Sequence, residues 1–209
     1  MFIYDLEIKK AILGRKDEPI EGIEYCKGWD DHAGMGISCI GGYDYQTQRY
    51  RVFCEDNMAD FTELLSRKTV LIGFNNIRFD NQLLLASDVL HADNFDLQAK
   101  SYDILQEVWK SLGLNPDKFW WKTHGGYGLT DMANANIGFA KTGHGGAMAP
   151  MQYQRGEWGG LIDYCLNDIF LTKGLMDLIL HKGSLKCPKT GKSLAIRRPD
   201  EGGPNGEKR

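Results

Sequence analysis

The sequence predicts an α/β fold in which one mixed β-sheet, with antiparallel and parallel strands, is flanked by α-helices. Residues 1–9 alternate as a strand does, and residues 36–45 and 48–55 form two further runs joined by a tight turn. Residues 69–74 are a short apolar run, and a helical pattern follows that run. Antiparallel strands followed by a strand–helix unit and then by helices are typical of a mixed sheet covered by helices.

The first strand, with the sequence M-F-I-Y-D-L-E-I-K, places Asp5 and Glu7 on the same face, because side chains alternate along a strand. Two carboxylates that share one face of an apolar strand repel each other and are costly to desolvate. A bound divalent cation would resolve this repulsion. An edge strand with a solvated acidic face explains the same nine residues, so the strand alone leaves both interpretations open.

Residues 11–36 have no regular period and contain five glycines and one proline, which predicts a long loop. The strands at 36–45 and 48–55 extend the first strand into a β-meander. Residues 57–67 have helical spacing of apolar side chains. The run at 69–74 is predicted to be a buried strand parallel to the first, and a helix is expected from Asp80 to about residue 90.

Helices are also predicted at residues 101–112, 129–139 and 157–181, the last being the longest. Residues 141–151 are glycine-rich and predict a flexible loop that lacks the spacing of a phosphate-binding loop. The expected organisation is one domain over residues 1–181 and a basic C-terminal tail over 182–209. The tail is expected to be either a small hairpin or disordered.

Charge is unevenly distributed along the 209 residues, whose net charge is −3. The tail has eight basic and three acidic residues, hence +5, which leaves −8 for residues 1–181. Five widely spaced cysteines without a C-x-x-C pair predict neither a disulfide framework nor a zinc knuckle. Without a leader or a membrane-length apolar run, an intracellular, cytoplasmic protein is expected. The oligomeric state is left open.

Two further aspartates and a tyrosine complete the set of candidate catalytic residues. Asp80 lies where the strand at 69–74 gives way to a helix, a place where an aspartate commonly caps the helix. Tyr164 and Asp168 are four residues apart on the last helix and therefore share one face. Such pairs are common on helices, so the pair is informative only together with Asp5, Glu7 and Asp80.

Taken in order, D-L-E on the first strand, Asp80 in G-F-N-N-I-R-F-D, and D-Y-C-L-N-D on the last helix resemble the DEDD superfamily of 3′–5′ exonucleases. This superfamily is the DnaQ-like branch of the RNase H-like fold. The resemblance spans residues 1 to about 181. Tyrosine four residues before the final aspartate indicates the DEDDy subgroup, and Asp163 stands where the histidine subgroup would need its histidine. The chain is similar to small stand-alone exonucleases of phages and bacteria.

The resemblance implies a phosphodiester hydrolase that uses two divalent ions, Mg²⁺ or Mn²⁺. It implies that Asp5, Glu7 and Asp168 hold the ion on the nucleophile side, and that Asp5 and Asp80 help to hold the other. Tyr164 is expected to orient the attacking water, because a phenol is a poor base near neutral pH. The implied substrate is the 3′ end of single-stranded or frayed DNA, with RNA as the alternative.

Several other residues are candidates for contacts with nucleic acid. Asn75, Asn76 and Arg78 flank Asp80, although either asparagine also suits the end of a strand. Trp120 and Trp121 suit stacking with bases, although adjacent aromatic residues also suit packing. His124 and His144 lie in glycine-rich loops, where exposure to solvent is expected.

Two other functions remain open from the sequence. One is an RNase H-like endonuclease or junction resolvase, which also uses clustered acids but does not require the Tyr164–Asp168 pair. The other is a nucleic-acid-binding or polymerase-accessory module without catalysis, which a missing carboxylate would have favoured. All four carboxylates are present.

Overall fold

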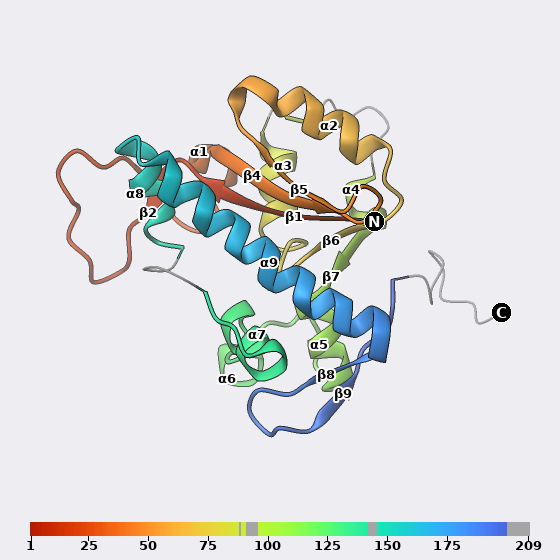
Figure 1. Cartoon of the computed structure of the whole chain (residues 1–209). Helices are drawn as coiled ribbons and strands as arrows, with labels where there is room; N and C mark the ends of the chain where they lie inside the picture. The colour runs from red at the N-terminus through yellow and green to blue at the C-terminus, as the bar shows by residue number, and fades with distance from the viewer. Residues whose placement is uncertain (88, 91–95, 142–145, 200–209) are drawn as a thin grey trace.

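A computed structural model describes residues 1–87, 89–90, 96–141 and 146–199. Its centre is a five-stranded sheet in the order β5-β4-β1-β6-β7 (Figure 1). The strands are β1 Phe2–Ile8, β2 Ala11–Ile12, β3 Tyr25–Cys26, β4 Ile37–Asp44, β5 Arg49–Phe53, β6 Leu71–Gly73, β7 Ser101–Asp103, β8 Ser184–Lys186 and β9 Ser193–Ala195.

The helices include one short 3-10 turn, η1, which leads directly into α2. Their bounds are α1 His32–Met35, η1 Glu55–Asn57, α2 Met58–Ser66, α3 Asp80–Ala86, α4 Leu97–Lys100, α5 Ile104–Ser111, α6 Trp121–His124, α7 Leu129–Ile137, α8 Ala149–Gln154 and α9 Trp158–Lys182.

The sheet is mixed, as the sequence predicts. Strand β4 pairs antiparallel with both β1 and β5, which completes the predicted meander. Strand β6 runs parallel to β1 and to β7. Because β1 lies between β4 and β6, it is the central strand, and it carries the D-L-E motif into the interior.

The two faces of β1 pack against different helices. Phe2, Tyr4, Leu6 and Ile8 join a core that includes Phe61 of α2. Ile3, on the other face, joins a second core with α5, α7 and α9. Figure 1 shows α9 crossing the sheet diagonally. By alternation, Asp5 and Glu7 belong to the face that α9 covers.

Some predicted elements differ from the structure. Residues 101–103 form β7 and not the start of a helix, because Asp103 caps α5 by accepting from the amides of Leu105 and Gln106. The predicted loop at 11–36 contains the short β2–β3 pair and α1, and α3 ends at Ala86. Helix α8 begins inside the predicted loop at 141–151, of which residues 142–145 lie outside the described residues.

Helix α9 packs directly over Gly41, the β4 residue that pairs with Asp5. A Cβ atom at Gly41 would lie 2.8 Å from the sulfur of Cys165 and 3.1 Å from Cγ1 of Ile169. Real Cβ atoms essentially never come as close as the first contact. The absence of a side chain at Gly41 therefore allows α9 to pack this closely against the sheet.

We expect Gly41→Ala to lower the free energy of unfolding by about 1–3 kcal/mol, the usual cost of overpacking a core. Thermal or urea unfolding measures this change. Gly159→Ala is the matched control, because no atom of the described residues, apart from its chain neighbours and its own helix backbone, lies within 4 Å of a Cβ at this helical position. The control is expected to be neutral or to stabilise by up to about 1 kcal/mol. Equal stabilities of the two variants would contradict the close approach.

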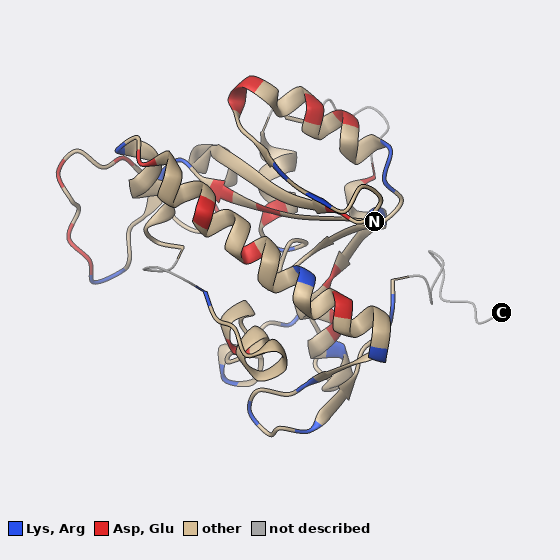
Figure 2. Cartoon of the chain, viewed as in Figure 1, with Lys and Arg blue, Asp and Glu red and all other residues tan. Residues whose placement is uncertain are grey.

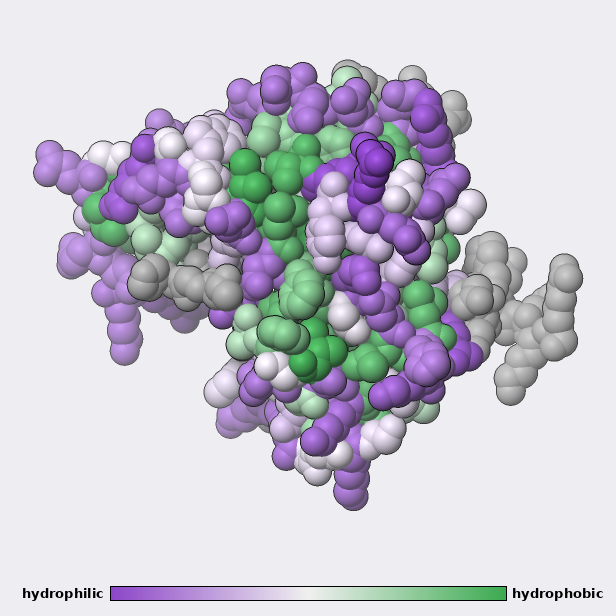
Figure 3. All heavy atoms as spheres, viewed as in Figure 1, coloured by the Kyte–Doolittle hydropathy of each residue, from purple (hydrophilic) through white to green (hydrophobic). Residues whose placement is uncertain are grey.

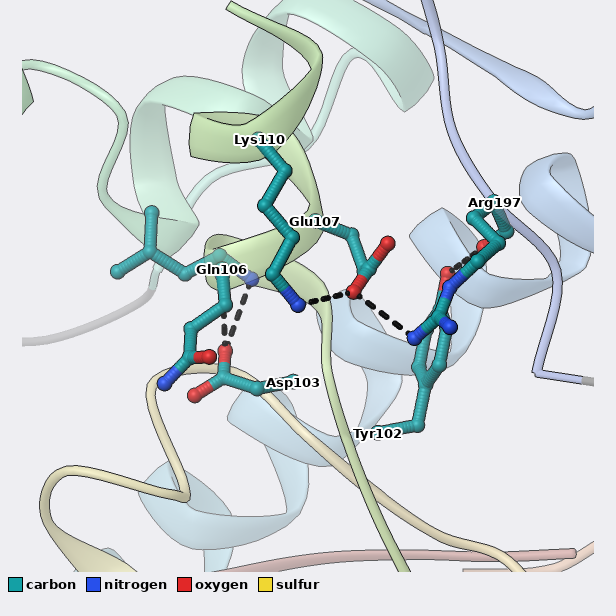
Figure 4. A network of polar contacts seen from close by, with 7 residues as sticks. Tyr102, Asp103, Gln106, Glu107, Lys110 and Arg197 are labelled. Carbon is teal, nitrogen blue, oxygen red and sulfur yellow. Dashed lines mark hydrogen bonds and ion pairs between the residues drawn. The ribbon is translucent and has the colours of Figure 1, made fainter. Parts of the chain in front are cut away.

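The C-terminal segment forms an antiparallel hairpin, one of the two alternatives that the sequence left open, with β8 paired to β9. Leu185, Leu194 and Ile196 are buried in the same core as α9. Figure 4 shows how the segment after β9 is held: Arg197 contacts the buried Glu107 at 3.2 Å, and the Tyr102 hydroxyl donates to the Arg197 carbonyl. Lys110 contacts the same Glu107 at 2.8 Å. Residues 200–209 of the predicted tail lie outside the described residues.

Figure 2 shows basic residues along the hairpin and the end of α9, and acidic residues along α2 and the middle of α9. Apolar residues are exposed over the middle of the face seen in Figure 3. The rings of two exposed residues, Phe139 and Phe170, lie 5.3 Å apart.

Within the described part of the chain, no helix has both the length and the apolar character needed to cross a membrane.

Candidate active site

One cavity of about 250 Å³ is lined by all five residues that the sequence singles out as catalytic. Two come from β1, one from the start of α3, and two from α9, so three distant segments of the chain meet there. These lining residues are Asp5, Glu7, Asp80, Tyr164 and Asp168. The structure brings the predicted set together.

Asp80 is positioned by a gap in the sheet and does not cap its helix. The pairing between β1 and β6 includes Ile3 but does not extend to Leu6. The Leu6 amide donates instead to Oδ1 of Asp80, at 3.1 Å. Phe79 occupies the N-cap position of α3, and its side chain makes no capping hydrogen bond. The carboxylate is thus held against β1, and the first turn of α3 favours its negative charge.

Asp103 shapes the loop between β6 and Asp80. Its buried carboxylate accepts from the amides of Asn75 at 2.9 Å and Ile77 at 3.2 Å. Asn75 has a φ of 68°, in the left-handed region. Sequence reasoning did not single out Asp103, because its partners lie 26 and 28 residues earlier in the chain.

The carboxylates of the cavity are largely removed from water, since Glu7, Asp80 and Asp168 are 6%, 4% and 3% exposed. Burial, and then repulsion from neighbouring carboxylates, raises the pKa of Asp5 and Glu7 well above their usual values. Burial also raises the pKa of Asp80, to about 7, although the Leu6 amide opposes this rise. The folded chain therefore concentrates negative charge that water stabilises poorly.

Lys141 is a member of the site that sequence reasoning missed. Its ammonium donates to the Tyr164 hydroxyl at 3.0 Å and forms an ion pair with Oδ2 of Asp168. Burial disfavours the charge of Lys141, but Asp168 and Asp5 outweigh this effect and raise its pKa. Nothing in the sequence marks this lysine, because it lies 27 residues before Asp168 and only the fold makes them neighbours.

The donor set fits a divalent cation. Oδ1 of Asp168 is one of three buried side-chain atoms without a hydrogen-bond partner among the described residues. An unpaired buried carboxylate oxygen is costly unless a cation neutralises it. Mg²⁺ and Mn²⁺ prefer carboxylate oxygens, and four carboxylates line this cavity against one lysine among its described lining residues.

A second cavity, of about 750 Å³, shares Asp5, Asp168 and Lys141 with the first. Asn75 and Arg78 line it, and the guanidinium carbon of Arg78 lies 4.7 Å from the centre of the Phe119 ring. Its wall also contains aromatic residues that sequence reasoning missed. These are Trp29, Phe74, Phe79, Trp109, Phe119 and Tyr127.

The remaining candidates for nucleic-acid contacts lie elsewhere. Asn76 is fully buried, and its amide nitrogen contacts the Tyr4 hydroxyl at 3.4 Å, so it suits the end of the strand. Trp120 and Trp121 are 57% and 69% exposed and line neither of these two cavities. Their exposure does not match the packing alternative.

His124 is buried, so the expectation that it is exposed is wrong. Its ring lies 4.9 Å from the ring of Trp109, and Nε2 is 3.1 Å from the Asn115 carbonyl oxygen. These backbone and ring contacts fold the glycine-rich segment inward, which its composition does not show. His144 lies outside the described residues.

Without metal, the stability of the protein is expected to fall as pH rises from about 3.8 to about 7. Over this range the folded state holds a proton on Asp80 that the unfolded state has lost, so unfolding becomes easier as pH rises. Asp80→Asn keeps an acceptor for the Leu6 amide and removes the titration. In chelator, the free energy of unfolding should depend less steeply on pH in the variant than in the parent across this range. The difference in slope should be up to about 1.4 kcal/mol per pH unit. Identical slopes would contradict the raised pKa.

Comparisons with known proteins show the fold. No protein-family model matches the chain, and no curated protein matches its sequence. Among solved structures, the family B DNA polymerase of the hyperthermophilic archaeon Pyrobaculum calidifontis is similar, with a TM-score of 0.55 and 16% sequence identity. The similarity covers 86% of this chain and 24% of the polymerase, so the chain spans about a quarter of that protein's length. The chain thus has an α/β fold with a mixed five-stranded sheet, consistent with the RNase H-like arrangement.

Proposed function

We propose that this chain is a metal-dependent 3′–5′ exonuclease of the DEDDy type that hydrolyses single-stranded or frayed DNA, with RNA as the alternative substrate. The observation that carries the proposal is the single cavity lined by Asp5, Glu7, Asp80, Tyr164 and Asp168. Phosphodiester hydrolysis requires a positioned water and stabilisation of the negative charge that develops on the phosphate. A site with four carboxylates and one phenol offers the means for both.

Asp5, Glu7 and Asp168 would hold one divalent ion, and Asp5 with Asp80 would help to hold the second. When bound, the two ions supply a nucleophile at neutral pH and neutralise charge on the attacking and leaving oxygens. They would also offset the mutual repulsion that raises the pKa of Asp5 and Glu7. Phosphate can then approach a site whose carboxylates would otherwise repel it.

Tyr164 orients the attacking water through its hydroxyl. Burial, and then the nearby Asp168 carboxylate, raises the pKa of Tyr164 to about 12, so the phenol stays protonated near neutral pH. A protonated phenol donates and accepts hydrogen bonds but does not serve as a base. Lys141 contacts this hydroxyl and Asp168 together, and so fixes the position of both groups.

The larger cavity suits the part of the nucleic-acid strand that leads to the site. Its aromatic wall offers faces on which bases stack, and Arg78 and Asn75 offer donors for the backbone. The similarity to a DNA polymerase supports a nucleic acid as the substrate. Residues 182–199, which contain the hairpin, have six basic residues and no acidic residue. Lys189 of this segment lies 4.2 Å from the ring of Tyr127, at the wall of the cavity.

We expect Lys189→Glu combined with Lys192→Glu to weaken the binding of single-stranded DNA and to reduce its salt dependence. Each lost phosphate contact lowers the slope of log K against log salt by about 0.7 for a single strand. Fluorescence anisotropy with labelled oligonucleotides at several salt concentrations measures both quantities. Both lysines are exposed, so the hairpin core stays intact.

Arg15→Glu combined with Lys16→Glu is the control, because it makes the same charge change in the exposed loop between β2 and β3. An equal loss of binding in both double variants would show that only net charge matters. Such a result would remove the hairpin from the substrate path.

The proposed function is tested with oligonucleotides labelled at the 5′ end, incubated with Mg²⁺, Mn²⁺ or chelator. A metal-dependent ladder that shortens from the 3′ end is expected. Internal cuts in duplex or branched substrates would instead identify an endonuclease or resolvase. Binding without cleavage under every metal condition would identify a non-catalytic module. Parallel DNA and RNA substrates of one sequence determine which sugar the site prefers.

A further inference from the structure

A thiol lies beside the carboxylates of the site. The sulfur of Cys165 and one carboxylate oxygen each from Asp5 and Glu7 all lie within 4.8 Å of one another. Cys165 follows Tyr164 on α9 and is only 1% exposed. Its Sγ is 3.7 Å from the backbone carbonyl oxygen of Asp5, which places the sulfur directly against β1.

This position follows from the packing of α9 on the sheet. Gly41 pairs with Asp5 in the β1–β4 register, and the Cys165 sulfur fills the space that a side chain at Gly41 would need. Asp168, three residues after Cys165, is 3% exposed and lines the cavity together with Asp5 and Glu7. Among the described residues its Oδ1 has no hydrogen-bond partner, which is an independent indication that the cluster takes a cation.

Hard ions such as Mg²⁺ make no use of a sulfur donor, whereas Zn²⁺ and Cd²⁺ bind thiolate and carboxylate together. Zinc bonds of about 2.3 Å to sulfur and about 2.0–2.2 Å to oxygen place tetrahedral donors roughly 3.5 Å apart. The 4.8 Å spread of the three donor atoms has to close by only about an ångström to meet that geometry.

We propose that Cys165, Asp5 and Glu7, with Asp168 as the fourth ligand, form a site that binds a thiophilic divalent cation. Zn²⁺ is the ion that we expect to occupy it. The Cys165 sulfur forms the bond to the ion, and its proton passes to buffer. The inference rests on the proposed function in one respect, that Asp5, Glu7 and Asp168 are the same carboxylates that would hold Mg²⁺ or Mn²⁺. Zn²⁺ therefore competes with the ion on the nucleophile side.

X-ray absorption on the full-length protein loaded with one equivalent of Zn²⁺ tests the proposal without DNA. The expected result is one sulfur neighbour at about 2.3 Å and oxygen neighbours at about 2.0–2.2 Å. Cys165→Ser should lose the sulfur neighbour and keep the oxygens. Cys54→Ser is the matched control and should keep the sulfur neighbour. Cys54 packs against the apolar cluster that contains Cys165 and Tyr164, but it is not among the three clustered donors.

A second readout is the ultraviolet charge-transfer absorbance of a cadmium–thiolate bond, followed as Cd²⁺ is added. If X-ray absorption finds no sulfur neighbour at Zn²⁺ in the parent protein, or if the parent shows no cadmium–thiolate band, the proposal is overturned. This holds even if no variant folds. A sulfur neighbour that persists in folded Cys165→Ser also overturns it. If the protein cleaves DNA with Mg²⁺ but forms no zinc–sulfur bond when loaded with Zn²⁺, only the proposed Zn²⁺ site is refuted. A zinc–sulfur bond in a protein that cleaves nothing refutes the proposed nuclease alone.

Discussion

Replacing Asp5 by asparagine is expected to reduce DNA cleavage by at least about 10²–10³-fold, the scale set by removing one electrostatic contact in a preorganised site. Asp5 is the carboxylate that the proposed mechanism assigns to both ions, so its loss weakens both at once. The folded protein should tolerate the change. Asparagine has nearly the same size, and removing the charge relieves repulsion from Asp80, Asp168 and Glu7.

Two measurements separate this outcome from unfolding. Without metal, the thermal unfolding temperature of Asp5→Asn should equal or exceed that of the parent, and the stabilisation by Mn²⁺ seen in the parent should largely disappear. Asp60→Asn removes one exposed carboxylate from α2 and is the control that should change neither property. Turnover near the parent level in saturating Mg²⁺ would remove Asp5 from the active site.

Replacing Tyr164 by phenylalanine is expected to lower turnover by roughly 10²–10⁴-fold, the range for a positioned acid–base group. The ring and its packing against Leu161 and Ala149 remain, and only the hydroxyl that contacts Lys141 is lost. Metal affinity and substrate binding should change little, because the proposed mechanism does not make the phenol a ligand. Single-turnover kinetics with metal titration separates these effects.

Two further variants make the Tyr164 test specific. Tyr153→Phe removes a hydroxyl from a tyrosine of α8 that packs in the same cluster, and it should leave turnover unchanged. Asp168→Asn should weaken metal binding, with partial rescue by added metal. A Tyr164→Phe protein as fast as the parent would make Tyr164 a packing residue and would remove the main reason for preferring the DEDDy subgroup.

Features that depend on local pattern could be predicted from the sequence alone. Alternation along residues 2–8 placed Asp5 and Glu7 on one face of a strand, and helical spacing placed Tyr164 and Asp168 on one face of α9. The meander and the parallel β6 also followed from pattern. Short elements such as β7, β2 and β3 did not, because two or three residues have no measurable period and form only where a neighbouring strand supplies hydrogen bonds.

Which side chains share an environment depends on how the elements pack together. Lys141 reaches Asp168 across 27 residues of the chain. Cys165 reaches Asp5 and Glu7 because α9 packs closely over Gly41. Burial of His124 and the role of Asp80 as acceptor for Leu6 arise in the same way. Local pattern records the period of each segment, whereas contacts between segments depend on close packing and on pairing every buried polar group, which only the folded chain fixes.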